Sequence, residues 1–194
     1  MERKKIISRK TKETEIELEL NLDGKGSAEI ETPVSFLSHV LESFAKHGNF
    51  DLKIKASGDV SVDPHHLIED LGICLGQAIF NCTEDKRGIA RFGFMAIPMD
   101  EAEVVVSLDL GGRAYLRFNV DMLNEKIENM STNLVEDFFR ALVSNASINL
   151  HINKNVGINS HHIIEAVFKA FGIALKNATR ITGDNSVPST KGAI

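Results

Sequence analysis

The sequence is poor in cysteine, and Cys74 and Cys82 are its only two. Neither belongs to a Cys-x-x-Cys pair, and Cys74 falls on an apolar helix face, so we expect buried or partly buried free thiols rather than a disulfide. No apolar run approaches the roughly 20 residues that span a bilayer. The amino-terminal residues also lack the apolar stretch of a secretory signal. These absences predict a protein of the reducing cytoplasm with no membrane partner.

An excess of basic residues is also missing. The chain has 22 Lys and Arg against 27 Asp and Glu, which gives a net charge of −5, and no basic stripe stands out. This balance argues against a nucleic-acid partner, because nucleic-acid surfaces are normally basic. The apolar fraction of 43% and the charged fraction of 25% are ordinary for a soluble globular protein.

One short helix-opening motif is present twice. Asp-Pro-His-His-Leu-Ile-Glu at residues 63–69 recurs as Asn-Ser-His-His-Ile-Ile-Glu at residues 159–165, at an offset of 161 − 65 = 96 residues. Each glutamate can share a helix face with a histidine of its own pair, whereas neighbouring histidines point about 100° apart and are not expected to serve one ion. Two such helices predict sites for two metals, with the candidate ligands His65, His66, Glu69, His161, His162 and Glu165.

The elements around the two motifs follow the same order in each half. The first half is predicted to contain strands over 16–22, 27–32 and 50–55, a helix over 33–48 and a motif helix over 65–79. The second half is predicted to contain strands over 103–110, 115–120 and 148–152, a helix from about 131 to 142 and a motif helix from about 160 to 177. A further strand is expected between the halves, over 89–97.

This order predicts an α+β fold in which duplicated β-β-α-β-α halves form a helix-and-sheet sandwich, since each sheet must cover one face. No flexible linker or low-complexity run separates the halves. We therefore expect a single compact domain, 1–194, made of two similar halves of about 1–86 and 87–194.

Three further polar residues are candidate ligands. His39 lies on the polar side of the first predicted helix, at four-residue steps from Ser43 and His47, and is either on a solvated face or a metal ligand. The intervals 65 − 39 = 26 and 161 − 137 = 24 agree closely, which favours a ligand role for His39. Asp137 stays open, because acidic residues are common on helix faces. Alternation turns His151 to the polar side of its strand, where a sheet-surface role is favoured.

The remaining candidate site residues are three scattered cations and a polar segment near the C-terminus. For Arg91, Arg113 and Lys191 a structural salt bridge is the default interpretation. Pro-Ser-Thr-Lys-Gly at 188–192 is polar enough to bind an anion and is equally typical of a disordered tail. Imidazole and carboxylate ligands suit Mn²⁺, Fe²⁺, Co²⁺ or Zn²⁺, so the residues alone do not identify the metal.

Taken together, these residues resemble one family, imidazoleglycerol-phosphate dehydratase of histidine biosynthesis. The resemblance covers nearly the whole chain. Besides the two His-His-x-x-Glu units, it rests on the segments 11–14 (Thr-Lys-Glu-Thr), 36–39 (Phe-Leu-Ser-His), 47–48 (His-Gly), 91–93 (Arg-Phe-Gly), 98–102 (Pro-Met-Asp-Glu-Ala), 112–113 (Gly-Arg) and 188–192.

The resemblance implies an enzyme with two Mn²⁺ ions per active site that dehydrates imidazole glycerol phosphate to imidazole acetol phosphate. It also implies a homo-oligomer, a 24-mer built from trimers, with active sites at subunit contacts. The implied metal ligands are His39, His65, His66, Glu69, Asp137, His161, His162 and Glu165. The implied substrate-binding residues are Glu13, His47, Arg91, Arg113, Ser189, Thr190 and Lys191.

Two positions depart from the family pattern. Ser38 stands where the family generally has Asp, which removes an expected partner of His39. Asp137 stands where many members have His, which shifts the preference toward harder ions.

Two metals suit this reaction because the proton lost from the glycerol carbon is not acidic. Ions on both ring nitrogens would let the imidazole become an imidazolate that expels the neighbouring hydroxyl. Metals lower the pKa of bound water by about 9 units, and the same effect on a ring N–H is worth about 12 kcal/mol. Arg91, Arg113 and Lys191 would hold the phosphate. Glu165 is the first acid–base candidate, with Glu13 and His47 as competitors.

Two other functions stay open at this point. A binuclear metallohydrolase acting on a phosphate ester would release inorganic phosphate, whereas dehydration leaves the phosphate attached. A non-catalytic domain whose metals only build an assembly would show no turnover at all.

Overall fold

The computed structural model of the chain describes residues 3–61, 63–123 and 125–194. Residues 1 and 2, which belong to the predicted first half, lie outside the described residues. The described elements of the first half are β1 (Lys4–Lys10), β2 (Thr14–Asn21), β3 (Ala28–Glu31), α1 (Ser35–Gly48), β4 (Asp51–Gly58) and α2 (His65–Cys82).

The second half repeats this order with one short hairpin added. Its described elements are β5 (Phe92–Met99), β6 (Ala102–Asp109), β7 (Tyr115–Asn119), β8 (Lys126–Ile127), β9 (Met130–Ser131), α3 (Leu134–Ala146), β10 (Asn149–Val156) and α4 (Ser160–Thr179). The strand orders β1-β2-β4-β3 and β5-β6-β10-β7 are the same topology, with one parallel pair in each sheet, β3 with β4 and β7 with β10.

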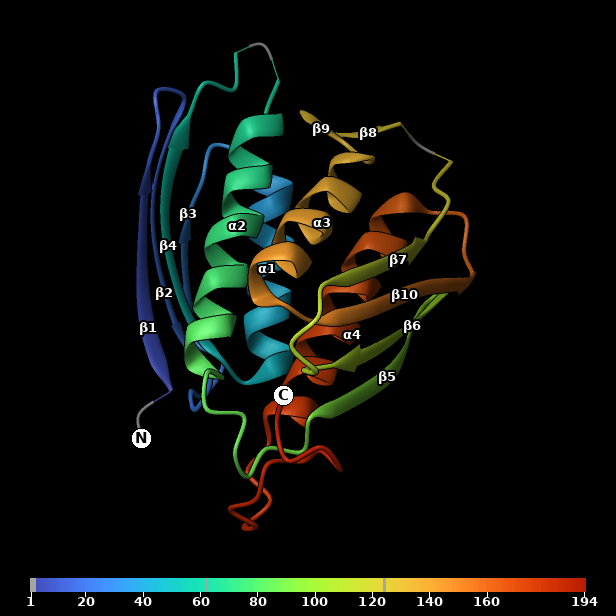
Figure 1. Cartoon of the computed structure of the whole chain (residues 1–194). Helices are drawn as coiled ribbons and strands as arrows, with labels where there is room; N and C mark the ends of the chain where they lie inside the picture. The colour runs from blue at the N-terminus through green and yellow to red at the C-terminus, as the bar shows by residue number, and fades with distance from the viewer. Residues whose placement is uncertain (1–2, 62, 124) are drawn as a thin grey trace.

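The two sheets form the outer layers and the four helices lie between them (Figure 1). Helix α2 packs on β1 and β2, and its counterpart α4 packs on β5 and β6. Across the middle layer, α2 packs against α3 and α1 packs against α4. Each motif helix is therefore paired with a shorter helix, and this pairing positions the candidate ligands. The predicted α+β sandwich of duplicated halves is confirmed.

The sequence patterns missed one strand and misplaced another. β1 was not predicted, and the strand expected between the halves over 89–97 is β5, the first strand of the second half. Each half therefore begins with one more strand than the predicted β-β-α-β-α unit. Pro98, expected to bound that strand, lies within β5, which is an edge strand, where proline costs no ladder hydrogen bond.

Two glycines allow the helices of the middle layer to approach closely. A Cβ atom on Gly72 of α2 would lie 2.4 Å from the backbone oxygen of Phe138 in α3. A Cβ atom on Gly172 of α4 would lie 2.6 Å from the backbone oxygen of Phe44 in α1. Both distances are far inside van der Waals contact, so the two helix pairs depend on glycine at these positions.

The two cysteines are free and buried, as expected. Burial raises the pKa of the Cys74 thiol and of the Cys82 thiol to about 11. Among the described residues, no helix combines the length and the apolar character that crossing a bilayer requires.

Candidate active site

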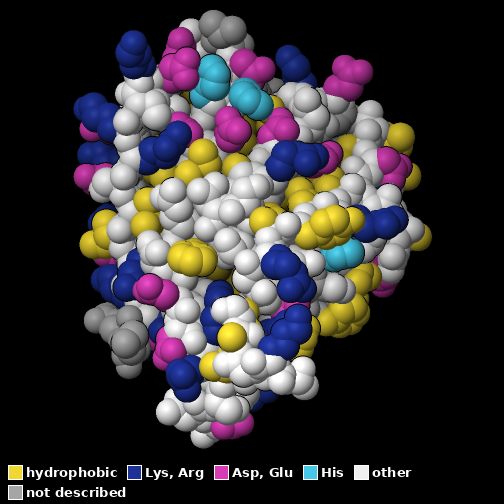
Figure 2. All heavy atoms as spheres, in the orientation of Figure 1, with side chains coloured by type: hydrophobic (Ala, Val, Ile, Leu, Met, Phe, Trp, Pro, Cys, Tyr) yellow, Lys and Arg dark blue, Asp and Glu magenta, His cyan; other side chains and the backbone are white. Residues whose placement is uncertain are grey.

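The two motif helices start in the same way. The Asp63 carboxylate accepts a hydrogen bond from the backbone N–H of His65 at 2.8 Å, and the Asn159 side chain accepts one from the backbone N–H of His161 at 2.9 Å. These acceptors satisfy amide groups that a helix leaves unpaired at its start. Helix α2 begins at the upper end of the molecule in Figure 1, where histidine and acidic side chains gather at the surface (Figure 2), and α4 begins at the upper right.

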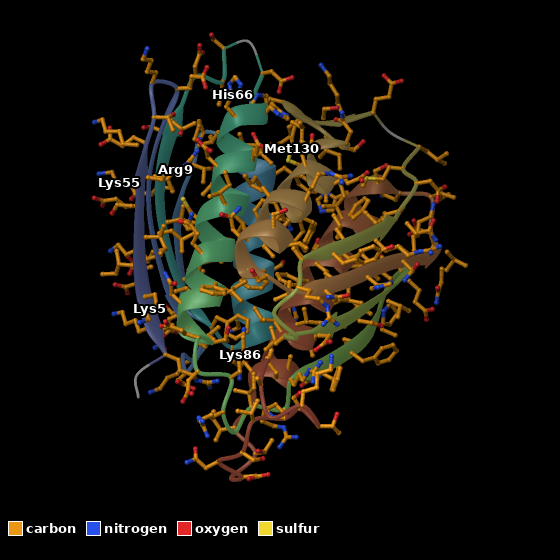
Figure 3. The ribbon with its side chains drawn as sticks, in the orientation of Figure 1. Lys5, Arg9, Lys55, His66, Lys86 and Met130 are labelled. Carbon is orange, nitrogen blue, oxygen red and sulfur yellow. The ribbon has the colours of Figure 1, made fainter. Side chains whose placement is uncertain are left out.

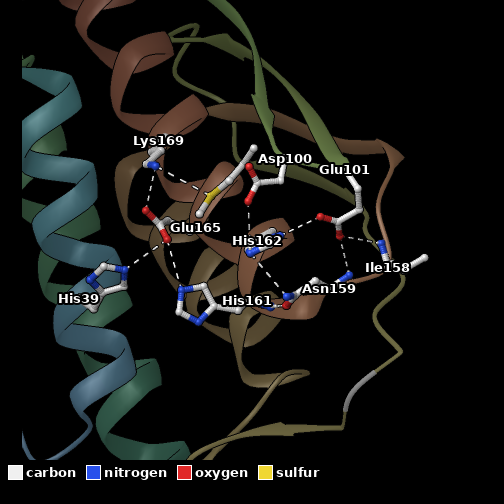
Figure 4. Close-up of polar contacts among 10 residues, drawn as sticks. His39, Asp100, Glu101, Ile158, Asn159, His161, His162, Glu165 and Lys169 are labelled. Atoms are coloured by element: carbon white, nitrogen blue, oxygen red, sulfur yellow. Dashed lines mark hydrogen bonds and ion pairs between the residues drawn. The ribbon is translucent and has the colours of Figure 1, made fainter.

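Three predicted ligands meet at the start of α4, in what we call the α4 cluster: His39, His161 and Glu165. The Oε2 atom of Glu165 lies 3.2 Å from His39 Nε2 and 3.3 Å from His161 Nε2 (Figure 4). One ligand atom from each residue lies within 4.8 Å of the other two. Two imidazoles and a carboxylate at this spacing can hold a divalent cation.

Electrostatics keep Glu165 ionised. The residue is only 7% exposed, and burial by itself raises its pKa, but the hydrogen bond from Lys169 Nζ at 2.8 Å and the contact with His39 outweigh burial and bring the pKa to about 2. The carboxylate is therefore available to a cation at neutral pH. His47 lines a cavity of about 430 Å³ together with His39, and its pKa is lowered by burial and by Lys169.

The first half contains a related but looser group, the α2 cluster: His65, Glu69 and Asp137, which among the described residues does not bring three ligand atoms within 4.8 Å of one another as the α4 cluster does. His65 Nδ1 lies 3.5 Å from Asp137 Oδ2, and His65 Nε2 lies 3.9 Å from Glu69 Oε2. The duplication relates His65 to His161 and Glu69 to Glu165, so Asp137 takes the place of His39. The α2 cluster thus offers one imidazole and two carboxylates where the α4 cluster offers two imidazoles and one carboxylate.

The second histidine of each motif turns away from its own cluster. His66, labelled at the upper end of α2 in Figure 3, lies with Nδ1 3.6 Å from Glu13 Oε2. His162 is bound by Glu101, whose Oε2 lies 2.7 Å from His162 Nδ1. That hydrogen bond raises the pKa of His162 and lowers the pKa of Glu101 to about 2. The structure thus separates neighbouring histidines, as the helical period of 100° per residue requires.

A second group of predicted residues meets near the C-terminus, in what we call the basic pocket. This cavity of about 830 Å³ is lined by Arg91, Arg113, Ser189, Thr190 and Lys191. Arg91 donates to Asp109 at 2.7 and 3.2 Å and to the Pro188 carbonyl at 2.8 Å, as the default salt-bridge interpretation expected. Among the described residues, neither Arg113 nor Lys191 forms an ion pair. The pocket therefore offers free positive charge to an anion.

The α2 and α4 clusters lie at the opposite end of the molecule from the basic pocket. Arg91 N–H donates to the carbonyl of Ala178 near the end of α4, whereas the α4 cluster lies at the start of that helix. At 1.5 Å per residue, the 178 − 161 = 17 residues between them span about 25 Å. Figure 1 shows the C-terminus at the lower end, away from the starts of α2 and α4.

Several residues near the candidate ligands were not predicted. Lys169 binds Glu165, Glu101 binds His162, and Asp109 binds Arg91. Lys169 had a usable signal, since it follows Glu165 by four residues on an otherwise apolar helix.

Two other residues from the sequence analysis lie outside both clusters. Ser38, which stands where the family generally has Asp, hydrogen-bonds the Thr32 hydroxyl at 2.9 Å. The ring of His151 lies beside Tyr115, with 5.5 Å between centroids, on the sheet surface as predicted.

Comparisons with known proteins identify one family. The family model described as imidazoleglycerol-phosphate dehydratase matches residues 32–175. A relative of that name from Thermodesulfovibrio yellowstonii is 56% identical over 192 residues, 99% of this chain and 100% of the relative. One from Acetivibrio thermocellus is 53% identical over 195 residues and covers 100% of both chains.

Solved structures lead to the same family. The crystal structure of imidazoleglycerol-phosphate dehydratase from Staphylococcus aureus is 40% identical, with a TM-score of 0.84 over 92% of this chain and 99% of that one. The Pyrococcus furiosus enzyme in complex with (S)-C348 is 36% identical, with a TM-score of 0.83 over 97% of this chain and 100% of that one. This chain therefore belongs to the imidazoleglycerol-phosphate dehydratase family, whose members are hydro-lyases of histidine biosynthesis.

Proposed function

We propose that this chain dehydrates imidazole glycerol phosphate to imidazole acetol phosphate with two divalent metal ions, Mn²⁺ being the first candidate. The proposal rests on the α4 cluster, in which two imidazole nitrogens face one buried carboxylate oxygen. The family to which the chain belongs supplies the reaction. A buried ionised carboxylate needs positive charge nearby, and a divalent cation would supply it.

The donor atoms fit such ions. Nitrogen and oxygen donors without a thiolate suit Mn²⁺ and its neighbours, and the extra carboxylate of the α2 cluster favours a harder ion there. The proposed ligands are His39, His161 and Glu165 in one cluster, His65, Glu69 and Asp137 in the other, and His66 and His162, which turn away from the clusters of their own chain. When bound, the ions would act as Lewis acids that lower the pKa of the substrate's ring N–H.

The chain's own residues would bind and orient the substrate. Arg113 and Lys191 carry free positive charge for the phosphate, and the hydroxyls of Ser189 and Thr190 add hydrogen-bond donors. Arg91, bound to Asp109 and Pro188, fixes the position of the 188–192 segment.

Proton transfer would fall to a carboxylate or imidazole that reaches the glycerol carbons. Glu165 is ionised and beside the metal cluster, which makes it the first candidate. Glu13, with its side chain 57% exposed, and His47 are the alternatives.

We further propose that a complete site needs more than one copy of the chain. The metal clusters and the basic pocket of one chain are about 25 Å apart along α4, far more than the length of a small phosphate ester. His66 and His162, which turn away from the clusters of their own chain, would then bind ions of neighbouring subunits. A metal-dependent 24-mer built from trimers, as the resemblance implies, meets this need. The cytoplasmic location stays a prediction.

The test uses purified protein stripped of metal. It should be inactive, dissociate into small oligomers, and regain both imidazole-acetol-phosphate formation and large size with Mn²⁺. No recovery with any divalent metal would refute the proposal. Release of inorganic phosphate instead would identify a metallohydrolase, and full assembly without turnover would identify a structural role.

A further inference from the structure

We propose that Glu101 is a positioning residue that holds His162 in the orientation and tautomer that let its Nε2 atom bind a metal ion of a neighbouring subunit. This inference rests on the proposed function, since it concerns one of the ligands proposed there for an ion of a neighbouring subunit. It adds a residue for which neither the sequence motifs nor the resemblance indicated a role.

The Glu101 carboxylate makes three hydrogen bonds, all to the start of α4. Its Oε2 atom lies 2.7 Å from His162 Nδ1, and its Oε1 atom accepts the backbone N–H groups of Ile158 at 3.2 Å and Asn159 at 2.8 Å (Figure 4). These bonds connect the turn between β5 and β6 to the residues that begin α4. The position of the imidazole is therefore fixed relative to both elements.

The same hydrogen bond selects the tautomer. An ionised carboxylate only accepts, so Nδ1 must carry the proton that it shares with Glu101. In the neutral form of the ring, Nε2 then carries the lone pair, and this is the form that a metal binds. The side-chain nitrogen of Asn159 lies 3.5 Å from Nε2, consistent with an acceptor at that atom. Asp100 Oδ2, 3.7 Å from Nε2, adds negative charge where a cation would approach.

The duplicated half supplies an internal comparison. Glu13 directly precedes β2 and Glu101 directly precedes β6, so the two glutamates occupy equivalent turns. Glu13 Oε2, however, lies 3.6 Å from His66 Nδ1, beyond hydrogen-bond distance, and both side chains are more than half exposed. Glu101 is thus hydrogen-bonded to His162, whereas Glu13 makes no such bond to His66 and is free to contact substrate, as the resemblance implies.

The test is Glu101→Gln, which keeps an oxygen for the two backbone N–H groups but presents an amide N–H₂ to Nδ1. This reverses the preferred tautomer and places the ring proton on Nε2. We expect the dissociation constant for Mn²⁺, measured by equilibrium dialysis, to rise by about 10- to 100-fold at one class of site. The melting temperature of the metal-free protein should not change, because the backbone hydrogen bonds remain.

Two controls separate positioning from a general structural effect. Glu103→Gln changes a nearby glutamate that binds Asn155 and touches no histidine, so Mn²⁺ affinity should stay at the wild-type value. In a double-mutant cycle, Glu101→Gln should add no further loss to His162→Ala, because the glutamate acts only through that ring. Independent, additive losses would overturn the inference.

The outcomes also separate this inference from the proposed function. If wild-type protein binds no Mn²⁺, the proposed metal sites are wrong and the inference falls with them. If wild-type protein binds Mn²⁺ and Glu101→Gln binds it equally well, only the positioning role of Glu101 is overturned. A lower metal-free melting temperature with unchanged affinity would likewise assign Glu101 a structural role alone.

Discussion

Glu165 is the residue of the α4 cluster that contacts both other members. It contacts two imidazoles and Lys169, and its carboxylate is the only buried member of the cluster. A buried carboxylate with these partners is stable as an anion, which suits a metal ligand and leaves it a weak base. Its proposed acid–base role therefore needs a direct test.

We predict that Glu165→Gln lowers kcat by about 10²-fold or more, as loss of a general base does. The substitution preserves shape and removes the ionised oxygen. Steady-state kinetics should be accompanied by metal analysis and substrate binding on the same protein. If the variant retains metal, binds substrate and turns over at the wild-type rate, the proton is handled elsewhere, and Glu13 or His47 becomes the first candidate.

The two thiols give a second prediction. A pKa of about 11 leaves Cys74 and Cys82 almost entirely protonated at pH 8, whereas roughly a quarter of an ordinary thiol with pKa 8.5 is thiolate there. Because the thiolate is the nucleophile, iodoacetamide should label the native protein slowly, and labelling should keep rising up to about pH 11. Fast modification of native protein at pH 8, matching the rate in denaturant, would contradict the burial of these thiols.

At the scale of elements, the close helix pairs bring the ligands together. Gly72 lets α2 lie against α3, which places His65 beside Asp137, and Gly172 lets α4 lie against α1, which places His161 beside His39. The α2 and α4 clusters therefore depend on the close packing of the paired helices as well as on the ligands themselves.

Gly72→Ala tests this dependence. A methyl group 2.4 Å from the Phe138 carbonyl forces the helices apart, so we expect a loss of about 1–3 kcal/mol in unfolding free energy, as for other overpacked sites. Mn²⁺ affinity should fall with it. Ser144→Ala, on the exposed side of α3, is the control and should stay within about 0.5 kcal/mol of wild type. Equal stability of both variants would show that the helices do not need this approach.

The elements also show where sequence patterns suffice. The motif helices and the central strands were predictable because their apolar residues recur at helical or alternating spacing. β1 was missed because two of its three inward positions are the charged Lys5 and Arg9, with Ile7 between them, and Arg9 binds Asp70 of α2 at 2.8 Å. An edge strand with charged inner positions has no apolar alternation to detect.

The same reasoning applies to the site. The clusters were predictable in outline because duplication doubled the His-His-x-x-Glu signal and related Asp137 to His39. The bond from Lys169 to Glu165 was missed although its spacing of four residues gave a signal. The bond from Glu101 to His162 was beyond sequence patterns, since it depends on a turn 61 residues away. Contacts of that kind arise from tertiary packing, which no local period encodes.

At the scale of the whole molecule, the two duplicated halves carry different candidate site residues. The halves share a topology, yet their clusters differ in charge because Asp137 replaces the imidazole of His39, and only the second half carries Arg91, Arg113 and the 188–192 segment that form the basic pocket. One chain therefore holds the two proposed metal clusters toward one end and the basic pocket toward the other. A site that needs both must combine copies of the chain.

Complementation between inactive variants tests that conclusion. Glu165→Gln removes a metal-site carboxylate and Arg113→Ala removes a cation of the basic pocket, and each variant alone should be nearly inactive. If each site takes residue 165 from one chain and residue 113 from another, a one-to-one mixture that is dissociated by chelation and reassembled with Mn²⁺ contains wild-type sites at random. Closed symmetric assemblies of equal copies give a fraction of about one quarter.

The reassembled mixture should therefore recover about a quarter of wild-type kcat, with the wild-type KM, because the restored sites lack neither residue. Mixing the same variants without dissociation is the control and should recover nothing while the subunits do not exchange. If the reassembled mixture stays as inactive as its parents, residues 113 and 165 of each site come from the same chain. The separation of about 25 Å along α4 would then have to be closed by a rearrangement within the subunit.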